Sequence, residues 1–402
     1  MADVQIMTGN SAAALAAKLS HVQVVAAYPI TPSTSIPESL SQYIESGELK
    51  AEFVRVESEH SALAVCISAS TIGARVFTAT SSHGLLYMHE QLHWAAGSRL
   101  PIVLCCANRG VGAPWSIFND QQDSIAQRDT GWIQIYCRNN QEIIDTVIQA
   151  YRIAEAVYLP VMVCYDGFVL SHTMMPVEVP DAERVIDFLP PYKPHTIVSP
   201  KNPKNINPVI FPWRRPDADG VLRDGYMELR YKLQKALLDA KEVIIETSRA
   251  YSDVFGRDHG GMLWTYKMDD ADVVLIGIGS AAMEATTAVD TLREQDILAG
   301  VVGIRVYRPF PKEEIKYCLG NAKSILIFEK DISYGYEGAL CADIKAALYR
   351  TDIKAPIHNY IIGLGGRDVK GREMKEATLA SLAEIASGVT EQKTVWLNCY
   401  TE

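Results

Sequence analysis

The chain has 402 residues, 48% of them hydrophobic, which is enough for two or three domains with substantial cores. Its 38 basic and 48 acidic residues give a formal net charge of −10, which argues against nucleic acid or an anionic membrane as a general partner. No apolar run is long enough to span a bilayer, and the N-terminus lacks the basic-then-apolar order of a signal peptide. We therefore expect a cytoplasmic protein.

The first part of the chain alternates between strand-like and helix-like patterns. Each short apolar run is followed by a longer segment of helical periodicity or by a polar loop. Because such alternation builds a mostly parallel sheet covered by helices, we predict a doubly wound α/β domain over residues 1–175. The strand-like runs are residues 22–28, 51–56, 74–81, 100–107, 132–137 and 159–167.

The composition changes after residue 175. Residues 176–216 contain ten of the nineteen prolines, so we predict an extended surface connector over 176–220. A helical connection follows over 221–265. A second alternation predicts a smaller doubly wound α/β domain over 266–402, with strand-like runs at 271–280, 299–310, 324–330 and 358–366.

The cysteines predict buried free thiols. No pair has C-x-x-C spacing, and most lie in apolar runs, so we expect no iron–sulfur cluster and no zinc site in this chain. His89 and His93 are four residues apart on one helical face, but no third ligand is evident and no metal site is expected. The cysteines are Cys66, Cys105, Cys106, Cys137, Cys164, Cys318, Cys341 and Cys399.

Polar residues follow the strands of the first predicted domain. Ligands of open α/β sheets bind beyond the carboxyl ends of the strands. Thr31 precedes Pro32, which suits the first position of a helix, so we predict that Thr31 is the N-cap of a helix beginning at residue 32. A hydroxyl held there can bind an anion, although a plain helix cap is the simpler interpretation.

Each of the other polar residues also has a simple structural explanation. Acidic residues are favoured in the first turn of a helix, serines cap helices, and an arginine in a loop pairs with carboxylates or water. Together they indicate a site for a small carboxylated molecule. Glycine-rich turns at 277–280 and 363–368 are weak phosphate signals, because neither is a G-x-G-x-x-G fingerprint or a P-loop. The polar residues after the strands are Tyr28, Thr31, Glu57, Ser58, Glu59, His60, Thr80, Ser81, Ser82, His83, Asn108 and Arg109.

Several strings resemble the alpha subunits of the pyruvate:ferredoxin oxidoreductase family. They include "AAYPITPST", "VESEHSALAVCISASTIGARVFTATSSHGLLYMHE", "RLPIVLCCANR" and "NDQQDSIAQRDTGWIQIYC", and the resemblance extends over nearly the whole chain. It implies oxidative cleavage of a 2-oxoacid with thiamine diphosphate, coenzyme A and ferredoxin. It also implies that the first domain is of the pyrimidine-binding type and the second of the transketolase C-terminal type.

The resemblance assigns roles to individual residues. Glu59 matches the acid that contacts the aminopyrimidine ring and shares its proton, so Glu57, two residues earlier, is a natural control. Thr31 and Arg109 match the residues that hold the substrate carboxylate. The other expected cofactor-binding residues are Tyr28, Pro29, Ser82 and His83.

The resemblance also implies that this chain is half of an active site. The diphosphate and its Mg²⁺ are expected on a beta subunit with a G-D-G…N signature, whereas the nearest string here is "YDGF" at 165–168. The [4Fe-4S] clusters are expected on the beta subunit and a ferredoxin-like delta subunit, with a gamma subunit completing a dimer of heteromultimers that reduces ferredoxin.

The loop at 110–123, "GVGAPWSIFNDQQD", is expected to border the substrate pocket. Its aromatic residues suit a small acyl group, which favours pyruvate, converted with coenzyme A to acetyl-CoA and CO₂ or formed in the reverse direction. Oxalate, 2-oxobutyrate, 2-oxoisovalerate and 2-oxoglutarate remain alternatives. A non-catalytic scaffold or regulatory paralogue is an alternative of another class, and the presence of Glu59, Thr31 and Arg109 argues against it.

Overall fold

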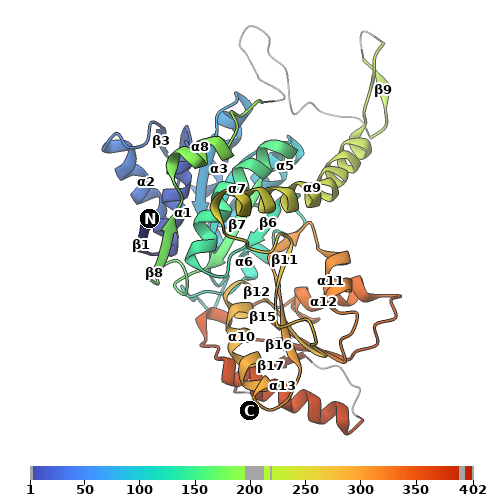
Figure 1. The fold of residues 1–402 in the computed structure, drawn as a ribbon. Helices are drawn as coiled ribbons and strands as arrows, with labels where there is room; N and C mark the ends of the chain where they lie inside the picture. Colours follow the sequence, from blue (N-terminus) through green and yellow to red (C-terminus); the bar gives the residue numbers. More distant parts are fainter. Residues whose placement is uncertain (1–2, 195–211, 218–219, 389–393, 401–402) are drawn as a thin grey trace.

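The computed structural model describes residues 3–194, 212–217, 220–388 and 394–400 (Figure 1). Its first domain contains a seven-stranded sheet in the order β14-β6-β7-β5-β4-β2-β3, parallel except for β14. Its central strands are buried along their whole length, which explains why they appear in the sequence as continuous apolar runs. Its parallel strands are β2 (Val24–Ala27), β3 (Glu52–Arg55), β4 (Val76–Thr80), β5 (Val103–Asn108), β6 (Ile133–Tyr136) and β7 (Val161–Asp166).

The helices of the first domain pack in two groups. One group brings α1, α2, α7 and the later helix α9 together, and the other brings α3, α4, α5 and α6 together. The predicted doubly wound α/β fold is therefore confirmed. The helices are α1 (Gly9–Leu19), α2 (Ser35–Glu45), α3 (Glu59–Thr71), α4 (Ser82–Tyr87), α5 (His89–Gly97), α6 (Gln122–Ile125) and α7 (Asn140–Val157).

The predicted extended connector begins instead with regular structure. Strand β8 (Met175–Val179) pairs antiparallel with β1 (Asp3–Met7), which supplies the backbone partners that an extended surface segment would lack. Asp181 then caps α8 (Ala182–Phe188) by accepting a hydrogen bond from the Arg184 amide. Residues 195–211 and 218–219 of the expected connector lie outside the described residues.

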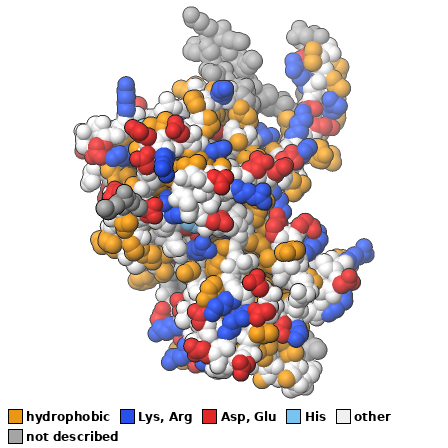
Figure 2. Space-filling view, viewed as in Figure 1, with side chains coloured by type: hydrophobic (Ala, Val, Ile, Leu, Met, Phe, Trp, Pro, Cys, Tyr) orange, Lys and Arg blue, Asp and Glu red, His pale blue; other side chains and the backbone are white. Residues whose placement is uncertain are grey.

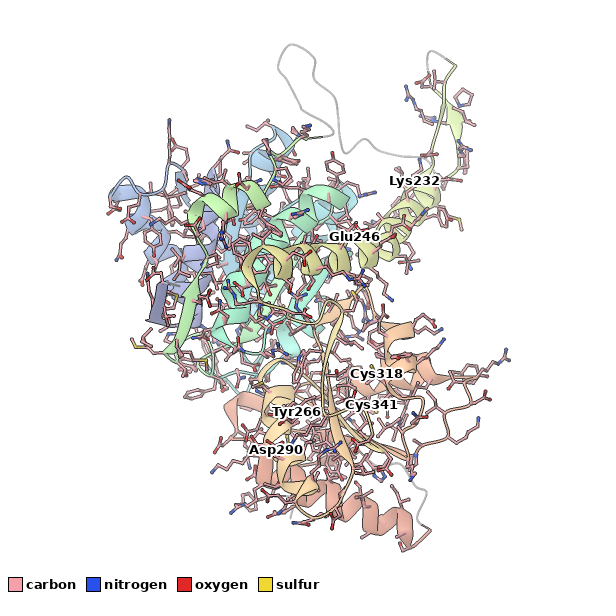
Figure 3. The ribbon with its side chains drawn as sticks, viewed as in Figure 1. Lys232, Glu246, Tyr266, Asp290, Cys318 and Cys341 are labelled. Carbon is pink, nitrogen blue, oxygen red and sulfur yellow. The ribbon has the colours of Figure 1, made fainter. Side chains whose placement is uncertain are left out.

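A hairpin and a long helix join the two domains. Strands β9 (Arg215–Pro216) and β10 (Leu222–Arg223) pair, and α9 (Tyr226–Phe255) follows. Figure 1 shows the hairpin at the far end of α9, projecting from the body of the molecule. Figure 3 labels Lys232 near that end of α9 and Glu246 where the helix lies against the first domain.

The second domain is built on a six-stranded sheet in the order β11-β13-β12-β15-β16-β17. All pairs are parallel except β11 with β13. Tyr266 of β11 donates a hydrogen bond to Asp290 of α10 at 2.8 Å, and the two lie side by side in Figure 3. The elements are β11 (Leu263–Tyr266), β12 (Val273–Ile278), α10 (Gly279–Arg293), β13 (Ala299–Ile304), α11 (Lys312–Cys318), β15 (Ser324–Glu329), α12 (Ala339–Leu348), β16 (Ile357–Ile361), η1 (Leu364–Gly366), α13 (Gly371–Ala386) and β17 (Thr394–Trp396).

The run at 299–310, predicted as a single strand, contributes to both sheets. After β13 in the second sheet, the chain crosses to the first sheet as β14 (Val306–Arg308), which pairs antiparallel with β6. Arg305 stands between the two strands, fully buried, and its Nε lies 2.9 Å from a Glu142 carboxylate oxygen on α7. Because β13 and β14 follow each other in the chain but belong to different sheets, the two domains are joined through backbone hydrogen bonds as well as side chains.

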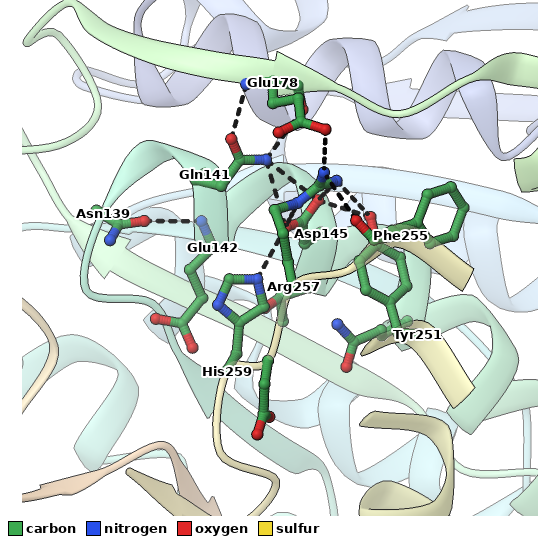
Figure 4. Close-up of polar contacts among 12 residues, drawn as sticks. Asn139, Gln141, Glu142, Asp145, Glu178, Tyr251, Phe255, Arg257 and His259 are labelled. Carbon is green, nitrogen blue, oxygen red and sulfur yellow. Dashed lines mark hydrogen bonds and ion pairs between the residues drawn. The ribbon is translucent and has the colours of Figure 1, made fainter. Parts of the chain in front are cut away.

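A second polar cluster fixes the end of α9 to the first domain (Figure 4). Asp145 of α7 accepts hydrogen bonds from Tyr251 at 2.6 Å, from both Nε and Nη2 of Arg257, and from His259 at 2.8 Å. Burial by itself raises the pKa of Asp145, but the hydrogen bonds from Arg257 and His259 outweigh it and hold the pKa below its ordinary value.

The cysteines are free thiols, and six of the eight are buried. Cys318 is partly buried and Cys399 is exposed; Figure 3 labels Cys318 and Cys341 in the second domain. Among the described residues, no group of three potential ligands is placed to hold a metal ion. Over the same residues, no helix combines the length and apolarity needed to cross a membrane. Figure 2 shows acidic and basic side chains interspersed over the face in view.

Candidate active site at the carboxyl edge of the first sheet

The structure gathers the predicted site residues at one edge of the first sheet. Strands β2, β3, β4 and β5 are parallel neighbours, so their carboxyl ends meet at this edge. Thr31 follows β2, Glu59 follows β3, and Arg109 follows β5 directly. Ser82 and His83 follow β4 and begin α4.

Thr31 is not a helix N-cap, so that prediction is wrong. Residues 31–34 form turns, and α2 begins at Ser35 with Thr34 at the cap position. The Ser33 amide bonds to the Ile30 carbonyl at 2.9 Å, which closes a turn where the helix was expected. Pro37 lies in the first turn of α2, where no intrahelical partner is needed for its missing N–H. The Thr31 residue is exposed.

Arg109 reaches back from β5 to the Thr31 turn. Its Nη1 donates to the Thr31 carbonyl at 2.9 Å, its Nε donates to the Ser116 carbonyl at 3.2 Å, and its guanidinium lies 5.9 Å from the centre of the Trp115 ring. Within the described chain, no acceptor is placed against Nη2. Burial lowers the pKa of Arg109, and Asp123 partly opposes this effect. Arginine in proteins is effectively always protonated, so the group is a cation. A buried cation with a free donor is suited to a carboxylate.

Glu59 is a buried acidic residue whose carboxylate has no partner among the described residues. It is the first residue of α3, where Ser58 caps the helix by accepting from the Ser61 amide at 3.2 Å. Glu59 is only 8% exposed, and within the described residues no side chain pairs or hydrogen-bonds with its carboxylate. Glu57, expected in the first helical turn, instead precedes the helix, is exposed and accepts a hydrogen bond from Ser61.

A glycine allows α4 to pack closely against Glu59 and Thr80. A Cβ on Gly84 of α4 would lie 2.7 Å from Glu59 Oε1 and would collide with Thr80 Oγ1. Thr80 Oγ1 and Ser81 Oγ are buried and have no hydrogen-bond partner among the described residues. An unpaired carboxylate and two hydroxyls without partners make a polar site that a ligand would satisfy.

Asp123, which the sequence patterns did not single out, ties the site together. This fully buried carboxylate accepts the amides of Ser82 at 2.8 Å and Arg109 at 3.0 Å, and the Asn108 side chain at 2.7 Å. Burial raises the pKa of Asp123, although hydrogen bonds, the largest of them from Asn108, oppose the shift. One side chain thus fixes the ends of β4 and β5 relative to each other.

The remaining predicted residues lie at different depths. Ser82 is fully buried and donates to the Gly110 carbonyl at 2.6 Å. His83 accepts from the Gly112 amide at 3.0 Å and meets the Trp115 ring edge-on. Tyr28 and Pro29 are exposed, and the described contacts do not join them to the other site residues.

The glycine-rich turn at 277–280 does not serve as an open phosphate site. Asp166, the last residue of β7, occupies this helix N-terminus by accepting the Ser280 amide at 3.2 Å and the Ser280 hydroxyl. Lys330 of the second domain lies 3.3 Å from the same carboxylate. The Asp of "YDGF" is therefore used to join the domains.

The turn at 363–367 also faces the first domain. The Gly366 amide donates to the Asn119 carbonyl at 2.7 Å, and the Gly365 amide lies 3.4 Å from an Asp120 carboxylate oxygen. Burial raises the pKa of Asp120 to about 7, with a further contribution from nearby Asp123. Both glycine-rich turns are thus contacts between the domains.

Comparison with known proteins identifies the family. A family model described as pyruvate flavodoxin/ferredoxin oxidoreductase, thiamine diphosphate-binding, matches residues 15–248. The chain belongs to this family. A second model, pyruvate:ferredoxin oxidoreductase core domain II, matches residues 271–374, so both domains agree with the resemblance seen in the sequence.

Relatives with two different substrates match almost equally well. The pyruvate synthase subunit PorA of Methanocaldococcus jannaschii is 46% identical, covering 99% of this chain and 98% of its own. The ketoisovalerate oxidoreductase subunit VorA of Pyrococcus horikoshii is 45% identical, covering 98% and 97%. The chain is therefore the alpha subunit of a 2-oxoacid:ferredoxin oxidoreductase, an oxidoreductase enzyme.

Solved structures support the fold. The 2-oxoglutarate:ferredoxin oxidoreductase from Magnetococcus marinus aligns with a TM-score of 0.73 at 20% identity, covering 95% of this chain and 66% of that one. A split-gene transketolase aligns with a TM-score of 0.52 at 13% identity, covering 94% and 98%. At these identities the likeness concerns architecture alone, and it agrees with the transketolase-type arrangement expected from the sequence.

Proposed function

We propose that this chain is the alpha subunit of a pyruvate synthase. The assembled enzyme converts pyruvate and coenzyme A to acetyl-CoA and CO₂, passes two electrons to ferredoxin, and can run in reverse. The observation that carries the proposal is the buried, unpaired Glu59 carboxylate beside Gly84, on the same sheet edge as Arg109. That combination provides both an acid for a ring nitrogen and a cation for a substrate carboxylate.

The residues present fit the pyrimidine end of thiamine diphosphate. This cofactor supplies the nucleophilic carbon that decarboxylation of a 2-oxoacid requires. Glu59 shares a proton with the N1′ atom of the aminopyrimidine, which relieves the cost of a buried carboxylate without a partner. Gly84 lets α4 pack closely against Glu59, and Thr80 and Ser81 offer the ring hydroxyls that have no partner among the described residues. Ser82, His83, Tyr28 and Pro29 border the same edge.

Arg109 and Thr31 bind the substrate carboxylate in this proposal. Arg109 is buried and fixed at Nε and Nη1, so its orientation is set before substrate arrives, which lowers the cost of binding. The exposed Thr31 adds its hydroxyl. The burial of Arg109 strengthens its charge-assisted contact, and the Trp115 ring lies 5.9 Å from its guanidinium.

The other half of the site comes from a partner. Asp166, the acid of the string nearest to a diphosphate motif, is already engaged by Ser280 and Lys330. We therefore assign the diphosphate, its Mg²⁺ and a [4Fe-4S] cluster to a beta subunit, with gamma and ferredoxin-like delta subunits completing a dimer of heteromultimers in the cytoplasm. The naming of relatives as subunits supports this assignment.

The surroundings of Arg109 favour a monocarboxylic 2-oxoacid such as pyruvate over a dicarboxylic one. In the described chain its side chain meets two carbonyls and the Trp115 ring, with no second cation of the kind that a dicarboxylate would need. The branched acid 2-oxoisovalerate is the second candidate, because the ketoisovalerate subunit of Pyrococcus horikoshii is 45% identical.

The test is reconstitution followed by a substrate panel. The single chain should be colourless and inactive, and co-expression with its partners should give a brown complex that reduces a dye acceptor with 2-oxoacid and coenzyme A. We expect the highest kcat/KM with pyruvate. A higher value with 2-oxoisovalerate would transfer the assignment to that acid, and a complex inactive with all 2-oxoacids would overturn the proposed function.

A further inference from the structure

Ser116 connects the proposed substrate anchor with the second domain. Its backbone carbonyl accepts from Arg109 Nε at 3.2 Å. Its Oγ lies 3.3 Å from the carbonyl oxygen of Gly365, to which it donates, and it accepts from the Phe118 amide at 3.2 Å. A short chain of hydrogen bonds therefore leads from Gly365, in the turn at 363–367, to the guanidinium of Arg109.

The turn is fitted closely against the loop that carries Ser116. The Gly366 amide bonds to the Asn119 carbonyl at 2.7 Å, and a Cβ on Gly366 would collide with the Cβ of Phe118. Gly366 has a φ of +78°, in the left-handed region that glycine tolerates best. The loop is also closed on itself, because the Gly110 amide bonds to the Phe118 carbonyl at 2.9 Å. Movement of the turn would therefore move Ser116.

We propose that the turn at 363–367 of the second domain positions Arg109 through Ser116 and thereby sets the affinity for the 2-oxoacid carboxylate. The inference rests on the proposed function, since it assumes that Arg109 binds that carboxylate. Ser116 and Gly366 act as positioning residues, because neither has to touch the substrate. A guanidinium recognises a carboxylate through a fixed fork of donors, so a small rotation about Nε costs binding.

A purely structural role for the turn at 363–367 predicts a different effect of the variants. If the turn only holds the domains together, its loss lowers the melting temperature of the complex and the amount of active enzyme. If it orients Arg109, its loss raises KM for the 2-oxoacid selectively. KM for coenzyme A serves as an internal reference in the same assay.

The first variant is Ser116→Ala in the assembled complex. We expect KM for pyruvate to rise about tenfold, because a charge-assisted contact is weakened rather than removed, with kcat and KM for coenzyme A nearly unchanged. Ser116→Thr keeps the hydroxyl and should restore KM. Ser68→Ala is the matched control, because Ser68 is exposed and donates only to a carbonyl of its own helix at 2.9 Å.

The second variant tests whether the change in KM for pyruvate depends on the turn of the second domain. Gly366→Ala should raise KM for pyruvate as Ser116→Ala does, and the double variant should be less than additive if both act through one contact. Gly388→Ala is the control, because Gly388 has a similar φ of +81° and no neighbour within 4 Å of an added Cβ. It should leave KM unchanged.

The outcomes separate this inference from the proposed function. A wild-type complex without 2-oxoacid-dependent activity overturns the proposed function. The inference alone is overturned if the wild type is active and KM for pyruvate is unchanged in both Ser116→Ala and Gly366→Ala. It is also overturned if KM for pyruvate and KM for coenzyme A rise together in these variants. If Gly366→Ala does not assemble, the comparison of Ser116→Ala with Ser116→Thr still tests the inference, because both variants keep the backbone of the loop.

Discussion

Arg109 Nη1 and the carbonyl oxygen of Thr31 lie 2.9 Å apart, joining the ends of two strands that are not adjacent in the first sheet. The contact uses the Thr31 backbone and leaves its hydroxyl available. Thr31 and Arg109 were each predicted from their position after a strand, but only the structure shows that they touch. Their side chains can therefore be tested separately.

Arg109→Lys should weaken binding of pyruvate strongly. Lysine keeps the charge but lacks the planar fork, so it cannot satisfy the Ser116 and Thr31 carbonyls and a carboxylate together. We expect kcat/KM to fall at least about tenfold, which corresponds to the low end of one hydrogen bond to a charged group, about 1.5–3 kcal/mol. Steady-state kinetics of the complex measure this. An unchanged kcat/KM would remove Arg109 from the site.

Thr31→Ala should preserve the position of Arg109. The backbone carbonyl that holds Nη1 is retained, so only the hydroxyl contribution is lost, about 1.5–3 kcal/mol if it reaches the carboxylate. The same kinetic assay applies, with Thr34→Ala as the control because Thr34 makes no side-chain cap hydrogen bond. Equal effects of the two alanine variants would contradict a role for the Thr31 hydroxyl.

Gly84→Ala should displace the Glu59 carboxylate. The added Cβ would lie 2.7 Å from Glu59 Oε1 and would also collide with Thr80 Oγ1, so the carboxylate proposed to meet the aminopyrimidine ring would have to move. The complex should lose affinity for thiamine diphosphate by at least about tenfold, measured by titration of the cofactor-free complex. Gly97→Ala in α5, which has no neighbour within 4 Å, should leave that affinity unchanged. Full affinity in Gly84→Ala would contradict a role for the position of Glu59 in binding the cofactor.

Asp120 should make stability depend on pH near neutrality. Its folded-state pKa of about 7 lies above the ordinary value of 3.8, so the folded protein holds the proton more tightly. Stability from this group is fully present below about pH 4 and is lost as the pH rises to about 7, by at most about 4 kcal/mol.

Asp120→Asn tests this dependence. The variant should therefore gain stability relative to wild type between pH 5 and pH 8, measured as the difference in unfolding free energy at the two values. A constant difference across this range would contradict the shift. Asp239→Asn, in an exposed pair with Lys235, is the control and should show no such trend.

Arg305→Met should destabilise the joint between the domains. Arg305 and Glu142 are both fully buried, and removal of the cation leaves Thr146 and Gln149 without their donor as well. Breaking a buried pair costs about 3–5 kcal/mol, to be measured by denaturant unfolding. Loss of the exposed Lys235–Asp239 pair should cost under about 1 kcal/mol. Similar costs for both would contradict a structural role for Arg305.

The features predicted best from the sequence are those that local residue patterns determine, namely the strands and the residues that follow them. The buried strands of the first sheet appear as apolar runs because both of their faces are covered, and Arg109 directly follows such a run. Glu59 follows β3, an edge strand that is only partly buried but still has a recognisable strand pattern. The error at Thr31 has a local cause as well. Two prolines compete for the helix start, and Pro37 inside the first turn allows the helix to begin at Ser35.

Contacts between residues far apart in the sequence could not be predicted from local patterns. Asp123 lies in the short helix α6, within a segment predicted as a loop, and its contacts with Ser82 and Arg109 span 41 and 14 residues. Strand β14 has three residues, and its partner β6 lies far away in the chain, so no local signal separates it from β13. The glycine-rich turn at 277–280 resembles a phosphate site because a helix N-terminus binds any anion, and here that anion is Asp166.

Exchange of the C2 proton of thiamine diphosphate bound to the assembled complex tests the role of Glu59 most directly. If Glu59 shares a proton with the aminopyrimidine, Glu59→Gln keeps the side-chain size but slows exchange by on the order of 10²–10⁴-fold. Glu57→Gln should exchange at the wild-type rate, because Glu57 is exposed and bonds only to Ser61 within the described chain. Equal exchange in the two variants would contradict the account, because Glu59 would then be no more than the first residue of α3.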